Sequence, residues 1–94
     1  MKDMQILESF DVGDDRSVFL LESPNQIDKV VFGIYDVIVD NQIFDTVTID
    51  GYRPFAGDES GKKISVVTTK KLLLKEQLAR GSICYLRESK RGRD

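Results

Sequence analysis

The sequence predicts an all-β fold, a small closed antiparallel barrel of about six strands with one short helical turn. Short segments with alternating apolar and polar residues recur along the chain, and turn-forming residues separate them. The clearest is Ile43–Gly51, IFDTVTIDG, in which Val47 and Ile49 alternate with polar residues. Lys70–Ala79 departs from this alternation and is the only stretch that predicts a helical turn. A closed ring is favoured because a small open sheet would expose unpaired edges.

The first two strands form a predicted hairpin. Met4–Phe10 is the first strand, Val12–Asp15 is its turn, and Ser17–Glu22 is the second strand. Pro24 interrupts the pattern after it, because proline cannot donate to a central ladder of hydrogen bonds.

The next two strands are predicted from their residue types and from the turn residues beside them. Lys29–Val39 is the longest apolar run, and its β-branched and aromatic content favours a strand. Gly33 indicates a bulge or a bend within that strand. Asp40–Asn41 predicts a tight turn into Ile43–Gly51, and Asp50–Gly51 predicts another turn at the end of that strand.

The last part of the domain contains the helical turn. In order, we expect a long loop over Tyr52–Lys63, a strand over Ile64–Thr69, a helical turn within Lys70–Ala79 and a strand over Ser82–Arg87. Leu74 and Leu78 would share one face of the turn, and Gly81 would end it. Residues 1–88 therefore form one predicted domain. Residues 89–94 form a basic tail that is expected to be disordered.

Composition limits the class of protein. Cys84 is the only cysteine, so no internal disulfide can form and folding needs no oxidising compartment. No apolar run approaches the roughly 18–20 residues of a membrane span, and the first residues lack the apolar region of a signal peptide. We therefore expect a cytoplasmic protein with no membrane partner.

Charge is distributed unevenly along the chain. Residues 1–60 hold 13 acidic and 4 basic side chains, whereas residues 61–94 hold 3 acidic and 10 basic side chains. This asymmetry has two interpretations. Either the two parts attract each other within one fold and leave a mixed surface, or the basic part forms a face for nucleic acid or an acidic partner.

Three segments resemble a known family. Ile6–Glu22, ILESFDVGDDRSVFLLE, resembles the opening hairpin of the second domain of elongation factor Tu and related translational GTPases. Ile43–Gly51 is similar to that family's next signature strand, and Lys70–Leu86, KKLLLKEQLARGSICYL, is similar to its leucine-containing turn and closing strand. The resemblance implies a free-standing closed antiparallel β-barrel that performs no chemistry. In that family the domain contacts the GTPase domain, ribosomal RNA and, in elongation factor Tu, the aminoacyl end of tRNA.

The family's tRNA-binding residues are mostly absent here. A gapless placement puts the family's glutamate at Thr68, its phenylalanine at Lys70, its arginine at Lys71 and its asparagine at Ser82. Only the positive charge at Lys71 is kept, and lysine lacks the planar fork of arginine. The resemblance therefore implies the barrel without this ligand.

No catalytic constellation is visible. The chain has no histidine, which excludes histidine bases and histidine metal ligands. Cys84 lies in a predicted strand and is expected to be a buried, unreactive side chain. Gly57–Lys63, GDESGKK, resembles a phosphate-binding loop but has three residues between its glycines instead of four, and no Ser or Thr follows its lysine. We expect a protein without enzymatic activity, cofactor or metal.

Basic and aromatic residues provide the candidate binding site. They are Lys70, Lys71, Arg80, Tyr52, Arg53 and Phe55, with the tail cations Lys90, Arg91 and Arg93. The alternative is that Tyr52 and Phe55 cover the barrel mouth and the lysines only face solvent. Two functions follow. The first is binding of a protein partner through a strand edge or the barrel rim, with self-association left open. The second is contact with RNA or the ribosome through the basic last third.

Overall fold

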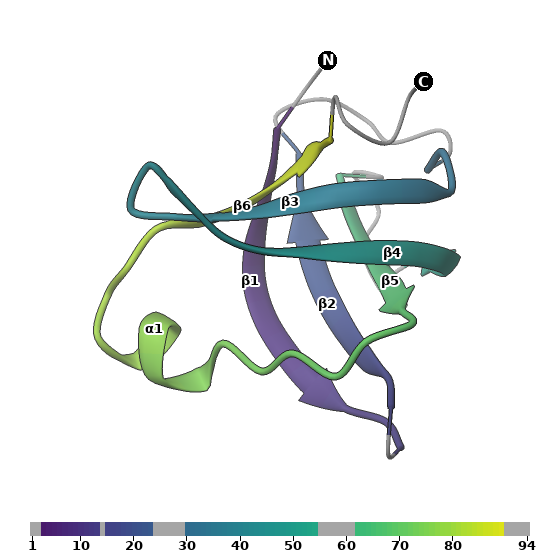
Figure 1. The fold of residues 1–94 in the computed structure, drawn as a ribbon, viewed down its shortest axis with the longest axis horizontal. Helices are drawn as coiled ribbons and strands as arrows, with labels where there is room; N and C mark the ends of the chain where they lie inside the picture. Colours follow the sequence, from purple (N-terminus) through teal and green to yellow (C-terminus); the bar gives the residue numbers. More distant parts are fainter. Residues whose placement is uncertain (1–2, 14, 24–29, 55–61, 90–94) are drawn as a thin grey trace.

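A computed structural model describes residues 3–13, 15–23, 30–54 and 62–89 of the protein. This part of the chain contains six antiparallel strands and one short helix (Figure 1). The elements are β1 (Met4–Asp11), β2 (Ser17–Glu22), β3 (Gly33–Val39), β4 (Gln42–Pro54), β5 (Lys63–Thr68), α1 (Lys75–Ala79) and β6 (Cys84–Glu88). The predicted all-β class, with six strands and one helical turn, is confirmed.

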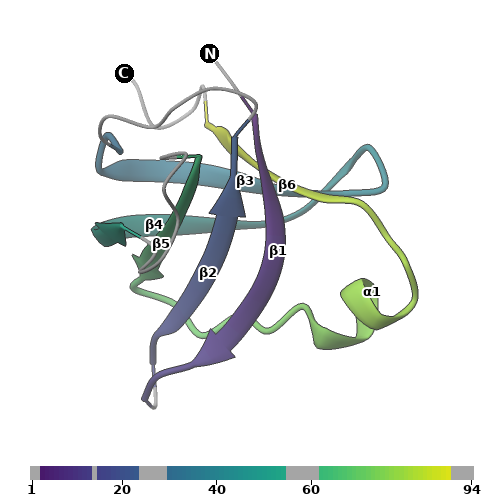
Figure 2. The ribbon, with the colours of Figure 1, turned by 180° about the vertical axis from the view of Figure 1, so that it is seen from behind.

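The hydrogen-bonded strands form a closed ring in the order β1-β2-β5-β4-β3-β6. Every pairing is antiparallel, and the ring closes between β1 and β6 through only two residue pairs, Met4 with Leu86 and Gln5 with Tyr85. β3 and β4 run across β1 and β2, and this crossing is visible from both sides (Figures 1 and 2). The hydrophobic core lies between these crossing strands.

Alternating side chains from all six strands fill the core. In β5, for example, Ile64, Val66 and Thr68 are buried while the residues between them are partly exposed. Phe19 and Tyr35 are the largest buried side chains. Leu74 precedes α1 and is fully buried in the same cluster, and Leu72 and Leu78 pack against it. The segment between β5 and β6 therefore covers one side of the core.

The predicted turn at Asp50–Gly51 is wrong, because β4 continues through these residues to Pro54. The pairing register with β5 shifts between Ile49 and Gly51, so Asp50 is the extra residue of a bulge. Its carboxylate accepts a hydrogen bond from Arg16 at 3.0 Å. A bulge absorbs the turn-like residues without ending the strand, since the ladder with β5 has residue pairs on both sides of Asp50, at Ile49 and at Gly51.

The β3–β4 hairpin confirms one prediction and corrects another. Asp40 and Asn41 both have positive φ, 50° and 70°, which is the conformation of a tight hairpin turn. Gly33 is not a bulge within a strand. It is the first residue of β3, with φ +149°, and the register shift of this hairpin lies at Phe44 on the opposite strand.

The helical turn lies within Lys70–Ala79, as predicted, and spans Lys75–Ala79. It begins at Lys75 because serine hydroxyls bind the backbone before it: the N–H groups of Leu72 and Leu74 donate to Ser17 and Ser9, both at 2.7 Å. The Leu78 N–H donates to the Leu74 carbonyl at 2.9 Å, so the two leucines share one turn as predicted. Gly81, with φ +88°, follows the end of the helix, which is also as predicted.

Several predicted segments lie outside the described residues. They are the break at Pro24, residues 55–61 of the predicted loop, the phosphate-loop-like stretch up to Gly61, and the tail from residue 90. Tyr52–Pro54, which the sequence placed in the loop, belong to β4. Within the described ranges, no helix has the length and apolarity needed to cross a bilayer.

Candidate interaction surface

Two residues of the predicted binding site, Lys70 and Lys71, and a third cation of the basic last third, Arg87, form ion pairs within the fold. Lys70 Nζ contacts Asp45 Oδ1 at 2.6 Å, and Lys71 Nζ contacts Asp11 Oδ2 at 3.0 Å. Arg87 donates two hydrogen bonds to the carboxylate of Asp3, at 3.0 and 2.8 Å. Each of these ion pairs joins the basic last third to the acidic first 60 residues. Three cations of the basic last third are therefore paired with the acidic part of the chain, which favours the first interpretation.

These ion pairs change the acidity of three carboxyl groups. The hydrogen bond from Arg87 lowers the pKa of Asp3 below its ordinary value of 3.8, and the hydrogen bond from Lys71 does the same for Asp11. Burial raises the pKa of Asp45. The hydrogen bonds from Lys70 and from the Thr46 N–H outweigh burial, so the net pKa is lowered.

We expect the free energy of unfolding to decrease below about pH 4. A carboxyl group with a lowered pKa in the folded state stabilises the fold above its unfolded pKa. That stabilisation disappears as the pH falls through the folded pKa. Urea unfolding at pH 7 and pH 3 measures the loss. A variant with asparagine at Asp3, Asp11 and Asp45 is the control, and an equally steep pH dependence in that variant would contradict the assignment.

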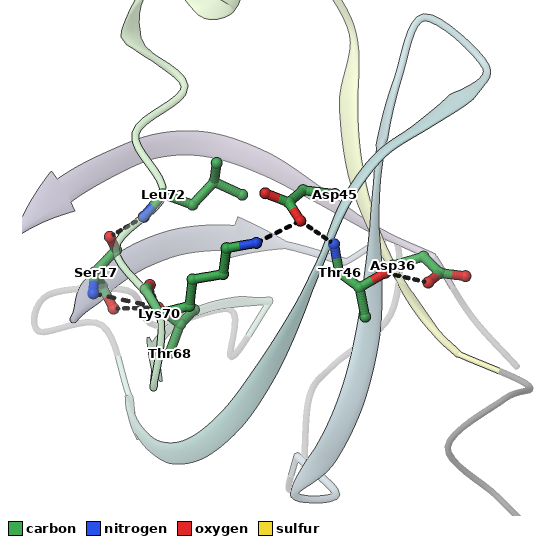
Figure 3. Close-up of polar contacts among 7 residues, drawn as sticks. All are labelled: Ser17, Asp36, Asp45, Thr46, Thr68, Lys70 and Leu72. Atoms are coloured by element: carbon green, nitrogen blue, oxygen red, sulfur yellow. Dashed lines mark hydrogen bonds and ion pairs between the residues drawn. The ribbon is translucent and has the colours of Figure 1, made fainter. Parts of the chain in front are cut away.

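Hydroxyl groups hold the start of the basic segment against the sheet (Figure 3). The Ser17 N–H donates to Thr68 Oγ1 at 3.2 Å, and Thr68 Oγ1 donates to the Lys70 carbonyl. The Ser17 hydroxyl accepts from the Leu72 N–H. Thr68 is fully buried, so its hydroxyl has a structural role in joining β2 to the segment after β5.

The structure does not bring the predicted binding residues together. Lys70 contacts Asp45 near the start of β4, whereas Tyr52 and Arg53 lie near its end. Tyr52 lies seven positions after Asp45 on β4, at most about 23 Å along the strand at 3.3 Å per residue. Arg80 lies at a third place, in a pocket at the tip of the β3–β4 hairpin lined by Val39, Asp40, Gln42, Ile43 and Phe44. Phe55 lies outside the described residues.

An apolar surface is a stronger candidate. The exposed large hydrophobic side chains among the described residues are Phe10, Val12, Val31, Phe32, Ile34, Ile43, Phe44, Tyr52 and Ile83. Phe32 and Tyr52 contact each other edge to face, with ring centroids 5.9 Å apart and an interplanar angle of 70°. Although paired, the two residues stay 56% and 39% exposed. We call this pair the aromatic patch; Val31, beside Phe32 in the chain, and Ile34 are also exposed.

The neighbouring core holds the aromatic patch in place. Tyr35 is buried, and its hydroxyl donates to the Val31 carbonyl at 2.7 Å. Ile34 lies opposite Thr48 in the β3–β4 ladder, and Phe32 lies two residues before Ile34. The sequence singled out only Tyr52 of this patch. The sequence signal for Phe32 was its place in the apolar run Lys29–Val39, of which only Gly33–Val39 forms a strand.

Cys84 has the environment of a structural residue. It is buried, as predicted, and burial raises the pKa of its thiol, with a further increase from the charge of Asp40. A raised pKa leaves little thiolate at neutral pH, and thiolate is the reactive form. Across residues 3–13, 15–23, 30–54 and 62–89, no group of three or more acidic or cysteine side chains is placed to hold a metal ion.

The fold and this surface define a small all-β protein with exposed apolar side chains on a ring of strands. No protein-family model matches the chain, and no curated protein or solved structure is significantly similar to it. The resemblance to the second domain of elongation factor Tu has no support from these comparisons.

Proposed function

We propose that this protein is a non-enzymatic interaction module that binds a protein partner through the aromatic patch. The observation that carries the proposal is the Phe32–Tyr52 pair, whose rings pack against each other while both stay exposed. Aromatic side chains are enriched at the centres of protein interfaces, because they bury a large area at low cost in conformational entropy. Adjacent exposed apolar side chains are also typical of a surface that a partner covers.

The proposal includes the finer assignment of the fold, a barrel similar to the second domain of elongation factor Tu. The antiparallel ring of six strands and the leucine-containing turn before β6 support it. In such a domain the strands form a scaffold, and binding depends on the side chains that the scaffold presents. Binding of aminoacyl-tRNA in the elongation-factor manner is not part of the proposal, since Thr68 is buried and Lys71 is paired with Asp11.

The alternative function, binding of RNA or the ribosome, has weaker support. Phosphate binding depends on cations that can exchange their counterions for phosphates. Lys70 and Lys71, which the sequence placed at the centre of such a site, already contact Asp45 and Asp11. RNA would have to break these pairs. We therefore favour the protein partner.

Replacing Phe32 by serine should weaken partner binding by about 30-fold or more, as expected for an aromatic residue at the centre of an interface. The partner is first captured by cross-linking in an extract of the source organism, then purified and titrated against each variant. Val12→Ser is the matched control, because Val12 is similarly exposed but lies on the β1–β2 hairpin. Equal affinity of the two variants would contradict the proposal. RNA capture that falls steeply with salt would favour the alternative.

A further inference from the structure

One side of β1 has no ladder partner over most of its length. β2 pairs with β1 from Gln5 to Asp11, whereas β6 pairs with it only at Met4 and Gln5. Among the described strands, no other pairs with β1 on the β6 side. Residues 6–11 therefore form a sheet edge, which we call the β1 edge. In both ribbon views α1 lies on this side of β1, opposite β2 (Figures 1 and 2).

Alternate backbone groups of β1 point toward the β1 edge. The Ser17 N–H donates to Thr68 Oγ1 on β5 at 3.2 Å, so it points away from Asp11, its partner on β1. In an antiparallel ladder, the backbone groups of two opposite residues either face each other or both point away. The N–H and C=O groups of Asp11, and of Ser9 two residues earlier, therefore point toward the edge. Those of Phe10, between them, face β2.

A groove separates the β1 edge from α1. It is lined by residues 7–10 of β1 and by Lys75, Leu78 and Ala79 of the helix, and its volume is about 420 Å³, within the range of ligand-binding pockets. Consecutive residues of a strand point to opposite faces, so a groove lined by four of them in a row opens onto the edge of the strand. Phe10 and Leu78 contribute apolar surface to it.

Two charged side chains line the groove from opposite walls, Glu8 on β1 and Lys75 on α1. Neither forms an ion pair within the described part of the chain. The Ser9 hydroxyl accepts the Leu74 N–H at 2.7 Å, so Lys75, the next residue, begins α1 beside Ser9. Glu8 precedes Ser9 and therefore points to the other face of β1. The two charges thus face different side chains of any strand bound in the groove.

We propose that the β1 edge binds an extended peptide segment of a partner protein, which adds to β1 as an antiparallel strand in the groove beside α1. The edge-directed N–H and C=O groups of Ser9 and Asp11 pair with the backbone of the peptide, as in other strand-addition complexes. β6 already pairs antiparallel with Met4 and Gln5 on this side, so the peptide continues an existing ladder.

Charge complementarity determines the order of side chains in the peptide. Read from its N-terminus, an antiparallel peptide passes Phe10, Ser9 and Glu8 in turn. An apolar residue opposite Phe10 covers a ring that is 43% exposed. An acidic residue opposite Ser9 faces Lys75, and a basic residue opposite Glu8 forms a cross-strand pair of opposite charge. The peptide therefore carries an apolar, an acidic and a basic residue in that order.

This inference goes beyond the proposed function. The aromatic patch joins Phe32, just before β3, to Tyr52 of β4, and neither of these strands pairs with β1. Binding at the β1 edge needs no contact with the aromatic patch. The two proposals can therefore fail separately.

The test titrates the protein with the peptide acetyl-Thr-Val-Glu-Lys-Thr-amide and follows its backbone amide signals by NMR. The control peptide, acetyl-Thr-Val-Lys-Glu-Thr-amide, has the same composition with the two charges exchanged. It should bind about tenfold more weakly, because it places like charges beside both Glu8 and Lys75. The first peptide should slow hydrogen exchange at the Ser9 and Asp11 amides, which gain a partner, more than at Phe10, which already faces β2.

Two matched comparisons locate the contact. Ala79→Trp fills the groove and should abolish binding, whereas Glu76→Trp, at an exposed position of α1 outside the groove, should not. A methyl group on the amide nitrogen of the peptide's glutamate should also abolish binding, because that N–H faces β1, whereas a methyl group on its valine nitrogen should not. Circular dichroism establishes that each protein variant is folded. The proposal is overturned if neither peptide binds, if the two bind equally, or if the folded Ala79→Trp variant still binds.

Discussion

Replacing Leu74 by alanine should lower the free energy of unfolding by about 2–5 kcal/mol, the range for truncating a buried leucine. Leu74 is fully buried and belongs to the main core cluster, although it lies outside every strand. Its backbone is fixed on both sides, by the Ser9 hydroxyl at its N–H and by the Leu78 N–H at its carbonyl. The surrounding chain therefore cannot collapse easily into the cavity, and the loss should not be small.

Urea unfolding measures this effect, and Leu73→Ala is the matched control. Leu73 is the neighbouring residue with the same side chain, but it is only partly buried. We expect its truncation to cost less than half as much as that of Leu74. Equal effects at the two positions would show that the segment before α1 does not cover the core as described.

Replacing Thr68 by valine should lower the free energy of unfolding by about 2–4 kcal/mol. The two side chains have nearly the same shape, so the change removes only the hydroxyl. That hydroxyl accepts from the Ser17 N–H and donates to the Lys70 carbonyl. Without it, two backbone groups lose their partners beside a fully buried side chain, and each such group costs about 1–3 kcal/mol.

The control for this change is Thr69→Val, at the next residue. The Thr69 side chain is exposed, and its described backbone hydrogen bond to Thr48 does not involve the side chain. We expect its effect to stay within about 0.5 kcal/mol. Amide hydrogen exchange at Ser17 gives a second readout, since loss of the Thr68 hydroxyl should speed exchange there. Unchanged exchange at Ser17 in Thr68→Val would contradict the assigned contact.

These two changes bear on function, because Thr68 and Leu74 flank the lysines that the sequence nominated for RNA. Between them, Lys70 and Lys71 are directed toward Asp45 and Asp11. A segment held by buried contacts at both ends presents its cations in fixed positions. Its lysines therefore serve the fold first, which is why we base the proposed function on the aromatic patch.

Local pattern was enough to predict most of the elements. Residue pattern and β-branched content identified all six strands, and the second was placed at its observed bounds, Ser17–Glu22. The Asp40–Asn41 turn and the shared face of Leu74 and Leu78 also followed from neighbouring residues alone. Each of these features depends on interactions within a few positions of the chain, so the sequence contains the information directly.

The pattern of residues along the chain was sufficient to predict the all-β class and the order of the strands, and the composition excluded histidine chemistry. The roles of the candidate residues became visible only in the folded protein. Asp50 is the extra residue of a bulge because β5 continues its ladder with β4 on both sides of it. Lys70 and Asp45 are 25 positions apart and meet only because β4 and the segment after β5 lie side by side. Phe32 and Tyr52, which are also distant in the sequence, form one surface only in the folded protein. Contacts between distant residues depend on the packing of the whole ring, which no local pattern of residues records.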